Sequence, residues 1–130
     1  MGAWGHRNFD NDTAADYVAT FQENPVESTL FESLEAAFED EYVDADVASE
    51  ALAAAEIVAA AQQKATSDFP QDLLPSIASL HFTNPESAKK LARRAVKAIL
   101  KESELQELWE EGDDYKSWRA VQRELLERLT

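Results

Sequence analysis

The sequence of 130 residues contains no cysteine, only three glycines and only two histidines. The absence of cysteine excludes disulfides, thiolate zinc sites and cysteine nucleophiles. Three glycines are too few for a glycine-rich phosphate-binding loop or for a β fold with many turns. His6 and His81 cannot supply a histidine-rich metal site. We therefore expect no cofactor. The length of 130 residues suits one domain with an ordinary hydrophobic core.

Long apolar runs are also missing. No run approaches the ~20 apolar residues that a membrane-spanning helix needs. Met1 is followed by glycine, tryptophan and charged residues, which is not the pattern of a secretion signal. We expect a cytoplasmic protein without membrane contact.

Acidic residues outnumber basic ones, and their distribution is uneven. The formal net charge is −14, from 26 acidic and 12 basic side chains. Residues 1–80 contain 16 acidic and 2 basic side chains, whereas residues 81–130 contain 10 of each. Such a field repels nucleic-acid phosphates, so we expect no nucleic-acid partner, and it attracts a basic protein. The alternative is an acidic surface that only keeps the protein in solution.

Apolar residues recur with helical spacing from about residue 11 onward, which predicts an all-α fold. We expect a single compact domain over residues 1–130, with about six short helices in a bundle-like or orthogonal arrangement. A non-helical N-terminal arm, residues 1–11, is expected to pack on the core. The alanine-rich segment is expected to form the central helix, because alanine lets neighbouring helices approach closely. Helices are predicted over residues 12–23, from 25 through 38, 47–66, 71–80, 85–101, from 103 to the glycine at 112, and from about 114.

The N-terminal arm carries the least expected pattern, with Trp4 and Phe9 in a segment without periodicity. One interpretation is a ligand-binding lip, or a carboxylate cluster of Asp10, Asp12 and Asp16 around a cation. The other is an extended arm that Trp4 and Phe9 pin to the core, with an acidic cap at the start of the first helix.

Spacing argues against a calcium loop at two further acidic segments. An EF-hand loop that begins at Asp10 or Asp44 requires glycine at its sixth position and glutamate at its twelfth, and the sequence has neither. We therefore expect no metal. Asp44 or Asp46 is expected to cap the alanine-rich helix.

Glu56 is the one charged side chain on the long alanine face. A buried carboxylate must be paired or protonated, and a raised pKa would suit a general acid. The alternatives are an ion pair with Arg93 or Arg94, or a place at the edge of the buried stripe. The basic face of the helix over residues 85–101 is expected to pair with acids of the second and third helices. No serine lies in a G-x-S-x-G turn, so no catalytic set is identified.

Three segments resemble a bacterial family catalogued as domain of unknown function 4259, and the resemblance covers essentially the whole chain. They are the opening MGAWG-HRN-FDNDTAADY, the middle YVDADVASEALAAAEIVAA and the late SELQELWEE. The resemblance implies a compact bacterial intracellular protein, and it brings no activity, cofactor or catalytic residue.

The leading hypothesis is a non-enzymatic, acidic interaction protein that binds a basic protein partner. A more specific form of this hypothesis is an immunity-like protein. The alternative is a small-ligand or metal-binding protein, or an enzyme, that uses the N-terminal carboxylates. A third possibility is a self-assembling subunit. The candidate ligand or partner site comprises Trp4, Phe9, Asp10, Asp12, Asp16, Asp44, Asp46 and Glu56.

Overall fold

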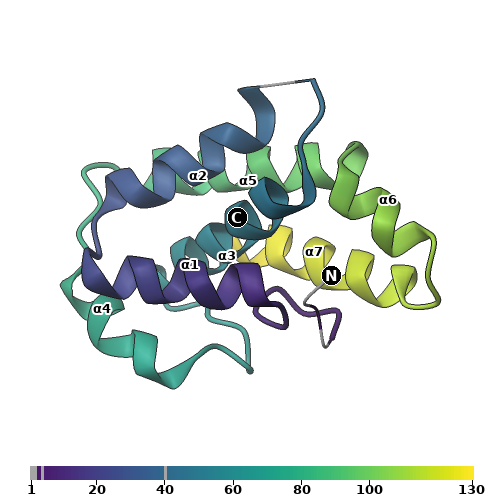
Figure 1. Ribbon diagram of the computed structural model, residues 1–130. Coiled ribbons are helices and arrows are strands. Elements are labelled where there is room, and N and C mark those ends of the chain that lie inside the picture. Colours follow the sequence, from purple (N-terminus) through teal and green to yellow (C-terminus); the bar gives the residue numbers. More distant parts are fainter. Residues whose placement is uncertain (1–2, 4, 40) are drawn as a thin grey trace.

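Helices account for the regular structure in the computed structural model, which describes residues 3, 5–39 and 41–130 (Figure 1). The predicted anchor Trp4 lies outside the described residues. Within the described residues the one β-type pairing is an isolated antiparallel bridge between Ala3 and Asn11. The all-α prediction is confirmed. The helices are α1 (Asp12–Glu23), α2 (Glu27–Glu39), α3 (Ala45–Ala61), the 3₁₀ turn η1 (Gln71–Leu73), α4 (Leu74–Ser79), α5 (Pro85–Lys101), α6 (Glu104–Glu110) and α7 (Tyr115–Arg128).

Polar side chains cap the N-terminus of four of these helices. Each side-chain oxygen accepts a hydrogen bond from a backbone N–H in the first turn, which would otherwise have no partner. Of the predicted candidates Asp44 and Asp46, Asp44 caps α3, and the cap of α1 is Asn11 instead of the predicted acidic residue. The four caps are Asn11 to Ala14, Asp44 to Val47, Asn84 to Ser87 and Ser103 to Gln106.

The alanine-rich helix α3 is shorter than predicted, since it ends at Ala61 and not near residue 66. Gln63 adopts a left-handed backbone conformation with φ of 65°. The N–H groups of Gln63 and Lys64 then turn back and bond to the carbonyls of Ala60 and Ala59. This closing motif normally has glycine at the left-handed residue. Because glutamine occupies that position, the sequence gives no stop signal there.

Other boundaries also differ from the prediction. Helix α3 begins at Ala45, two residues before its predicted start. Helix α2 begins at Glu27, two residues after Pro25. The predicted helix over residues 71–80 begins as the 3₁₀ turn η1 and continues as the short helix α4, which ends at Ser79.

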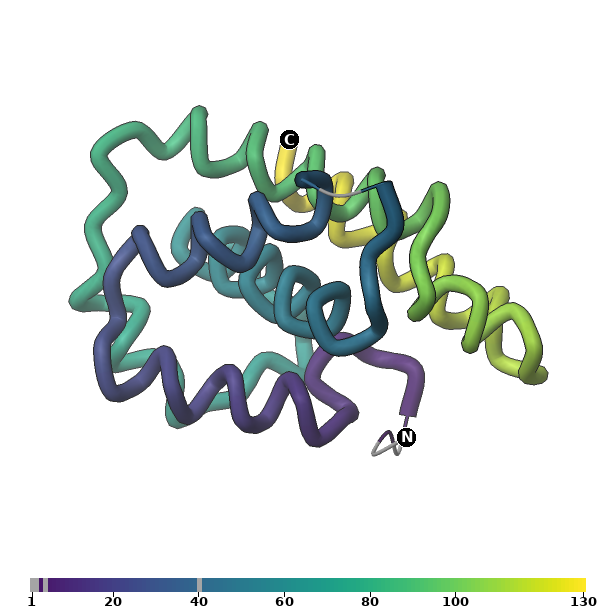
Figure 2. Tube along the Cα trace, turned by 45° about the horizontal axis from the view of Figure 1, so that its top comes forward, coloured from purple at the N-terminus to yellow at the C-terminus, as the bar shows by residue number. Residues whose placement is uncertain are grey.

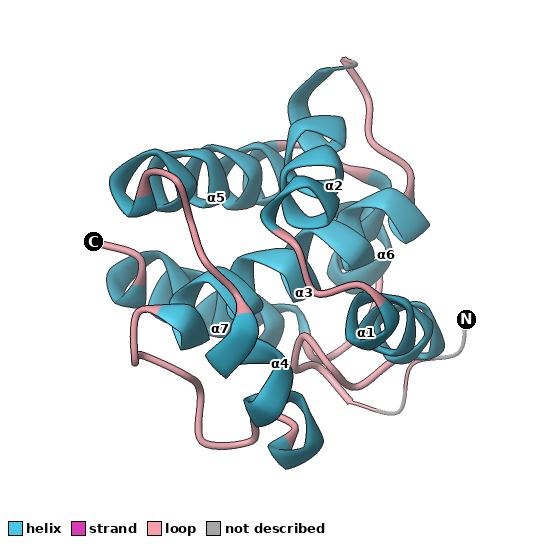
Figure 3. Ribbon diagram, turned by 90° about the vertical axis from the view of Figure 1, so that its left-hand side faces the viewer, coloured by secondary structure: helices cyan, strands magenta, loops and turns pink. Residues whose placement is uncertain are grey.

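Helix α3 is the central element, as predicted. In Figures 1 and 2 it runs through the middle of the molecule, with the other helices around it. In the view turned by 90°, helices α2 and α5 lie on one side of α3, and helices α1 and α4 lie on the other side (Figure 3). Every residue from Ala51 to Ala60 is buried. Small side chains on all faces allow this close approach. No helix among the described residues is both long and apolar enough to cross a bilayer.

The alanines of α3 generate a packing prediction. Ala55 is fully buried, so Ala55→Leu adds volume where no space exists and should destabilise the fold by about 1–3 kcal/mol. Urea denaturation measures this as a lower midpoint. Ala19→Leu, at an exposed position of α1, is the matched control and should change the midpoint little. Equal midpoints for the two variants would contradict the close packing around α3.

Candidate functional site

The N-terminal arm packs on the core through Phe9. Its ring meets the ring of Phe69 edge to face, with centroids 5.5 Å apart and planes at 85°. The Asp10 side chain lies against Gly5, and a side chain at position 5 would force the Asp10 carboxylate to shift. Phe9 is an anchor of the kind that the second interpretation of the arm predicts.

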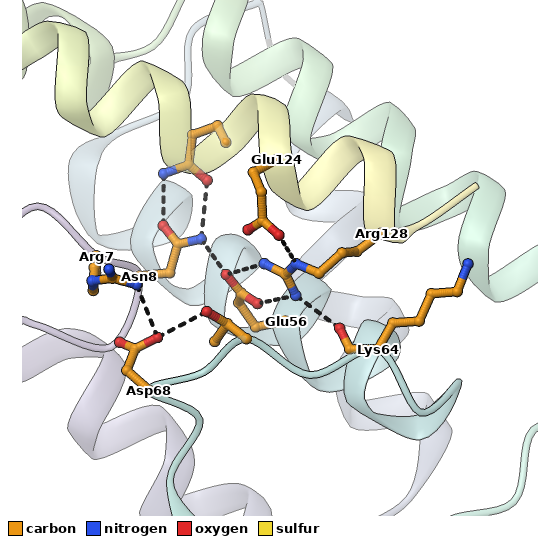
Figure 4. A network of polar contacts seen from close by, with 9 residues as sticks. Arg7, Asn8, Glu56, Lys64, Asp68, Glu124 and Arg128 are labelled. Atoms are coloured by element: carbon orange, nitrogen blue, oxygen red, sulfur yellow. Dashed lines mark hydrogen bonds and ion pairs between the residues drawn. The ribbon is translucent and has the colours of Figure 1, made fainter.

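A buried polar cluster, defined as Asn8, Glu56, Gln122 and Arg128, joins the arm to α3 and α7 (Figure 4). The amides of Asn8 and Gln122 pair reciprocally. Gln122 Nε2 donates to Asn8 Oδ1 at 2.7 Å, and Asn8 Nδ2 donates to Gln122 Oε1 at 3.0 Å. Asn8 Nδ2 also donates to Glu56 Oε2 at 2.9 Å. One asparagine of the arm therefore satisfies polar groups on two helices.

Arg128 is the cation that faces Glu56, and the predicted partners Arg93 and Arg94 are wrong. Its Nη1 lies 3.0 Å from Glu56 Oε1, and its Nη2 donates to Oε2 at 3.3 Å. The same guanidinium donates to the Lys64 carbonyl at 3.0 Å and to Glu124 at 2.6 Å. The guanidinium thus ties the end of α7 to α3 and to the loop that follows α3.

The basic side chains of α5 point to other groups. Arg93 donates to the carbonyl of Leu129 at 2.6 Å, and the guanidinium carbon of Arg94 lies 4.1 Å from the centre of the Phe38 ring. Within the described residues the ion pair of α5 joins Lys89 to Glu86 of the same helix. The expected pairing of this face with acids of α2 and α3 is therefore wrong.

Glu56 is 2% exposed, and burial raises the pKa of its carboxyl group. The hydrogen bonds and charge of Arg128, and the hydrogen bond of Asn8, oppose that rise without cancelling it. Oε1 is the one buried side-chain polar atom of the described residues without a hydrogen bond, although Arg128 lies close to it. Because Glu56 is buried and bonds to Asn8 of the arm and to Arg128 of α7, we interpret it as a residue that positions the arm.

The arm also covers a cavity of about 120 Å³, which we call the arm cavity. Asp12 of α1 and Asp46 of α3 both line it, and Asp46 Oδ1 accepts a hydrogen bond from Thr13 at 3.1 Å. Two of the predicted site residues, Asp12 and Asp46, therefore line the same cavity. The contact between their helices joins Thr13 and Asp46, which are 33 positions apart in the sequence. Other lining residues include His6, Arg7, Asn8, Asn11, Ser49, Trp109 and Trp118.

The remaining predicted residues do not join this group. Asp16 is exposed on α1, and Asp44 caps α3. Among the residues that the structure describes, no group of three or more His, Asp or Glu side chains could hold a metal ion. Asp10, Asp12 and Asp16 therefore do not form the cation-binding cluster of the first interpretation.

A second hollow, the acidic groove, lies between the loop before α3 and helix α6. It measures about 550 Å³, and no basic residue lines it. Tyr42 donates to Glu107 Oε2 at 2.7 Å, and this bond raises the pKa of the Tyr42 hydroxyl to about 12. We define the groove by its lining residues Tyr42, Glu104, Glu107, Leu108, Glu110 and Glu111.

Several of these residues escaped the sequence analysis, although signals existed for some. Residues 102–114 hold seven acidic and no basic side chains, a run that a charge count over the whole second half conceals. Gln122 lies between Trp118 and Leu125 on the apolar stripe of α7, where a polar residue indicates a buried hydrogen bond. For Arg128, no local pattern distinguishes it from the other arginines of α7.

Comparison with known proteins gives one match. The model of a family described as Domain of unknown function (DUF4259) matches residues 2–121. No curated protein and no solved structure matches the chain. The matched residues include the arm, the arm cavity and the acidic groove, whereas Gln122 and Arg128 lie beyond them.

The buried polar cluster predicts strong coupling between Glu56 and Arg128. Arg128→Met leaves a carboxylate in the core without its cation and should cost about 3 kcal/mol or more in unfolding free energy. Adding Glu56→Gln removes that charge and should recover part of the loss. A double-mutant cycle by urea denaturation measures the coupling. If the double variant loses as much unfolding free energy as the two single variants lose in total, the two side chains are not coupled.

The raised pKa of Glu56 predicts the sign of a pH effect. A folded-state pKa above the ordinary 4.5 means that the folded protein holds this proton more tightly than the unfolded chain does. The contribution of Glu56 to stability is therefore greatest below pH 4.5 and falls as the pH rises through the raised pKa. We expect the unfolding free energy of the wild type, minus that of Glu56→Gln, to decrease over this range. The control is Glu124→Gln, which removes an exposed contact of the same arginine. If the difference between the wild type and Glu56→Gln increases with pH, the pKa of Glu56 is lowered and not raised.

Proposed function

The chain belongs to the family described as Domain of unknown function (DUF4259), and from this premise we propose that it is a non-enzymatic protein that binds a basic partner. The supporting observation is the shortage of internal counter-charges. Among the acidic residues of segment 1–80 that the structure describes, only Glu56 and Asp68 form ion pairs. Within the described residues the other carboxylates of this segment have no ion-pair partner, although Glu27, Asp44 and Asp46 accept hydrogen bonds from neutral groups.

The acidic groove is the surface that suits a basic segment best. Tyr42 and Leu108 are 48% and 39% exposed, which is high for large apolar side chains. An aromatic face binds a guanidinium or ammonium group, and Leu108 can contact the methylene stem of the same side chain. The surrounding glutamates supply acceptors for charge-assisted hydrogen bonds. The groove therefore offers each kind of contact that an arginine or lysine side chain makes.

Backbone bonds hold the two walls of the groove together before any partner arrives. The Glu104 N–H donates to the Val43 carbonyl at 2.9 Å, and the Ala45 N–H donates to Glu104 Oε1 at 2.7 Å. A surface that is already ordered loses less conformational entropy on binding. The groove can thus bind without first rearranging α6.

The net charge of −14 supports the same proposal at longer range. A field of one sign accelerates encounter with a partner of the opposite sign, and salt weakens it. We place this binding in the bacterial cytoplasm. An immunity-like protein that covers the basic surface of a toxin would use the same chemistry.

The test compares a groove variant with a matched surface variant. Leu108→Ser combined with Glu107→Gln removes one exposed apolar side chain and one carboxylate from the groove. Val26→Ser combined with Glu23→Gln removes the same two kinds of group elsewhere, and Val26 is also 39% exposed. We expect a basic protein recovered at low salt from the native host to bind the groove variant at least tenfold more weakly, a change of about 1.4 kcal/mol.

Direct titration with an arginine-rich peptide, followed by NMR, locates the contact. Peak shifts should gather on Tyr42 and Leu108, and binding should weaken as salt is added. Equal binding by both variants, or shifts spread over all acidic helices, would show that charge alone and not the groove attracts the partner. Absence of any basic partner at low salt would refute the proposal.

A further inference from the structure

A concentration of positive charge, which we call the basic hollow, lies between α5 and α7. These two helices pack side by side (Figure 2). The hollow measures about 290 Å³, and no acidic residue lines it. Its four basic side chains are exposed, whereas its tyrosine and leucine are half-buried. We define it by its lining residues Lys97, Leu100, Lys101, Tyr115, Arg119 and Arg123.

The fold supplies no counter-charge to these four cations. The ion pairs of the described residues all use other basic side chains. Lys97 and Lys101 are four residues apart on α5. Arg119 and Arg123 have the same spacing on α7. Like charges at this spacing repel each other on a helix surface. An external group with several negative charges would relieve the repulsion on both helices at once.

The acidic groove has the composition that the basic hollow requires. The hollow combines four cations with one tyrosine and one leucine. The groove combines four glutamates with one tyrosine and one leucine, and no basic residue lines it. Glu104, Glu107 and Glu110 of the groove accept hydrogen bonds from neutral donors of the same chain. We infer that a second copy of this chain docks on the basic hollow, with its acidic groove over the four cations.

The basic hollow is ordered before a second copy arrives. Tyr115 stacks on Trp118, with ring centroids 6.1 Å apart, and Trp118 is 2% exposed. This ordered floor loses little conformational entropy on binding, as do the fixed walls of the groove. The guanidinium groups of Arg119 and Arg123 can each bind a glutamate through two N–H groups. The exposed Leu108 of the groove can contact the apolar floor of the hollow.

The net charge makes this association weak and reversible. Two copies repel each other at long range, because both have a net charge of −14. At about 0.15 M salt the screening length is about 8 Å, so distant charges interact little while a groove and a hollow in contact still attract. Each surface is also smaller than the roughly 20–30 residues a side of a standard interface. Association should therefore appear only at high protein concentration.

This inference does not rest on the proposed function, because the basic hollow takes no part in binding a basic partner. The two proposals share the acidic groove, so a second copy competes with a basic partner for it. A variant that alters only the hollow keeps its groove. Such a variant should bind the arginine-rich peptide no more weakly than the wild type does, which makes failure of one proposal distinguishable from failure of the other.

The experiment measures the mean mass of the full chain by sedimentation at about 0.15 M salt. The mean mass of the wild type should rise between about 10 μM and about 1 mM protein. The hollow variant combines Lys97→Glu with Arg119→Glu, and a reversed-groove variant combines Glu107→Lys with Glu111→Lys. Each variant alone should associate at least about tenfold more weakly. Their equimolar mixture should associate as the wild type does, because the intact and the reversed surfaces are then both complementary.

A matched control separates the hollow from general charge effects. Lys90→Glu combined with Lys116→Glu reverses two exposed cations of the same helices outside the hollow and should leave the association unchanged. The reversed-groove variant has less net negative charge than the wild type, so its loss of association cannot come from stronger overall repulsion. The melting temperature of each variant shows that it is folded.

Four results would each overturn the inference. They are a constant monomer mass for the wild type, undiminished association of the hollow variant or of the reversed-groove variant, loss of association in the matched control, and a mixture of the two folded variants that stays monomeric. Undiminished association of the reversed-groove variant, together with loss in the hollow variant, would show that a different acidic group occupies the hollow.

Discussion

The structure depends on one carboxylate placed inside the segment of α3, Ala51 to Ala60, in which every residue is buried. Taking a charge out of water is costly unless ion pairing and hydrogen bonds replace the lost solvation. Glu56 obtains part of this replacement from the arm, through Asn8, and from the end of α7, through Arg128, while burial still raises the pKa of its carboxyl group. The arm and α7 are in turn held to each other by the amide pair of Asn8 and Gln122. The same contacts fix the arm over its cavity, so the electrostatic requirement of Glu56 also shapes the candidate site.

Helix positions were predictable because their signals are local. Asn84 followed by Pro85, for example, marks the start of α5 through a cap and a restricted backbone, and neither depends on the rest of the fold. The end of α3 was not predictable, since Gln63 takes a left-handed conformation that glutamine seldom adopts. The partner of Glu56 was missed for a different reason. Arg128 lies 72 residues away, and helical periodicity places side chains on faces without stating which faces meet. The arm cavity brings together Asp12 and Asp46, which were predicted, and Ser49, which gave no signal.

Opposite charges are separated in the second half of the chain, although their counts there are equal. The acids gather on α6 and beside it, where they form the acidic groove. Basic side chains gather between α5 and α7, in a hollow of about 290 Å³ lined by Lys97, Lys101, Arg119 and Arg123 with no acid among them. Net charge over a segment therefore describes the surface poorly. Charge over a single helix, combined with the neighbours that the fold provides, describes it well.

The long separation between Glu56 and Arg128 has a consequence for biosynthesis. A ribosome that adds roughly 5–20 residues per second needs about 4–14 s to translate the intervening 72 residues. During that interval the nascent chain contains the glutamate but not its arginine. The emerging α3 must keep this carboxylate hydrated or protonated until α7 is made, so the native contacts of Glu56 form only after Arg128 has been added.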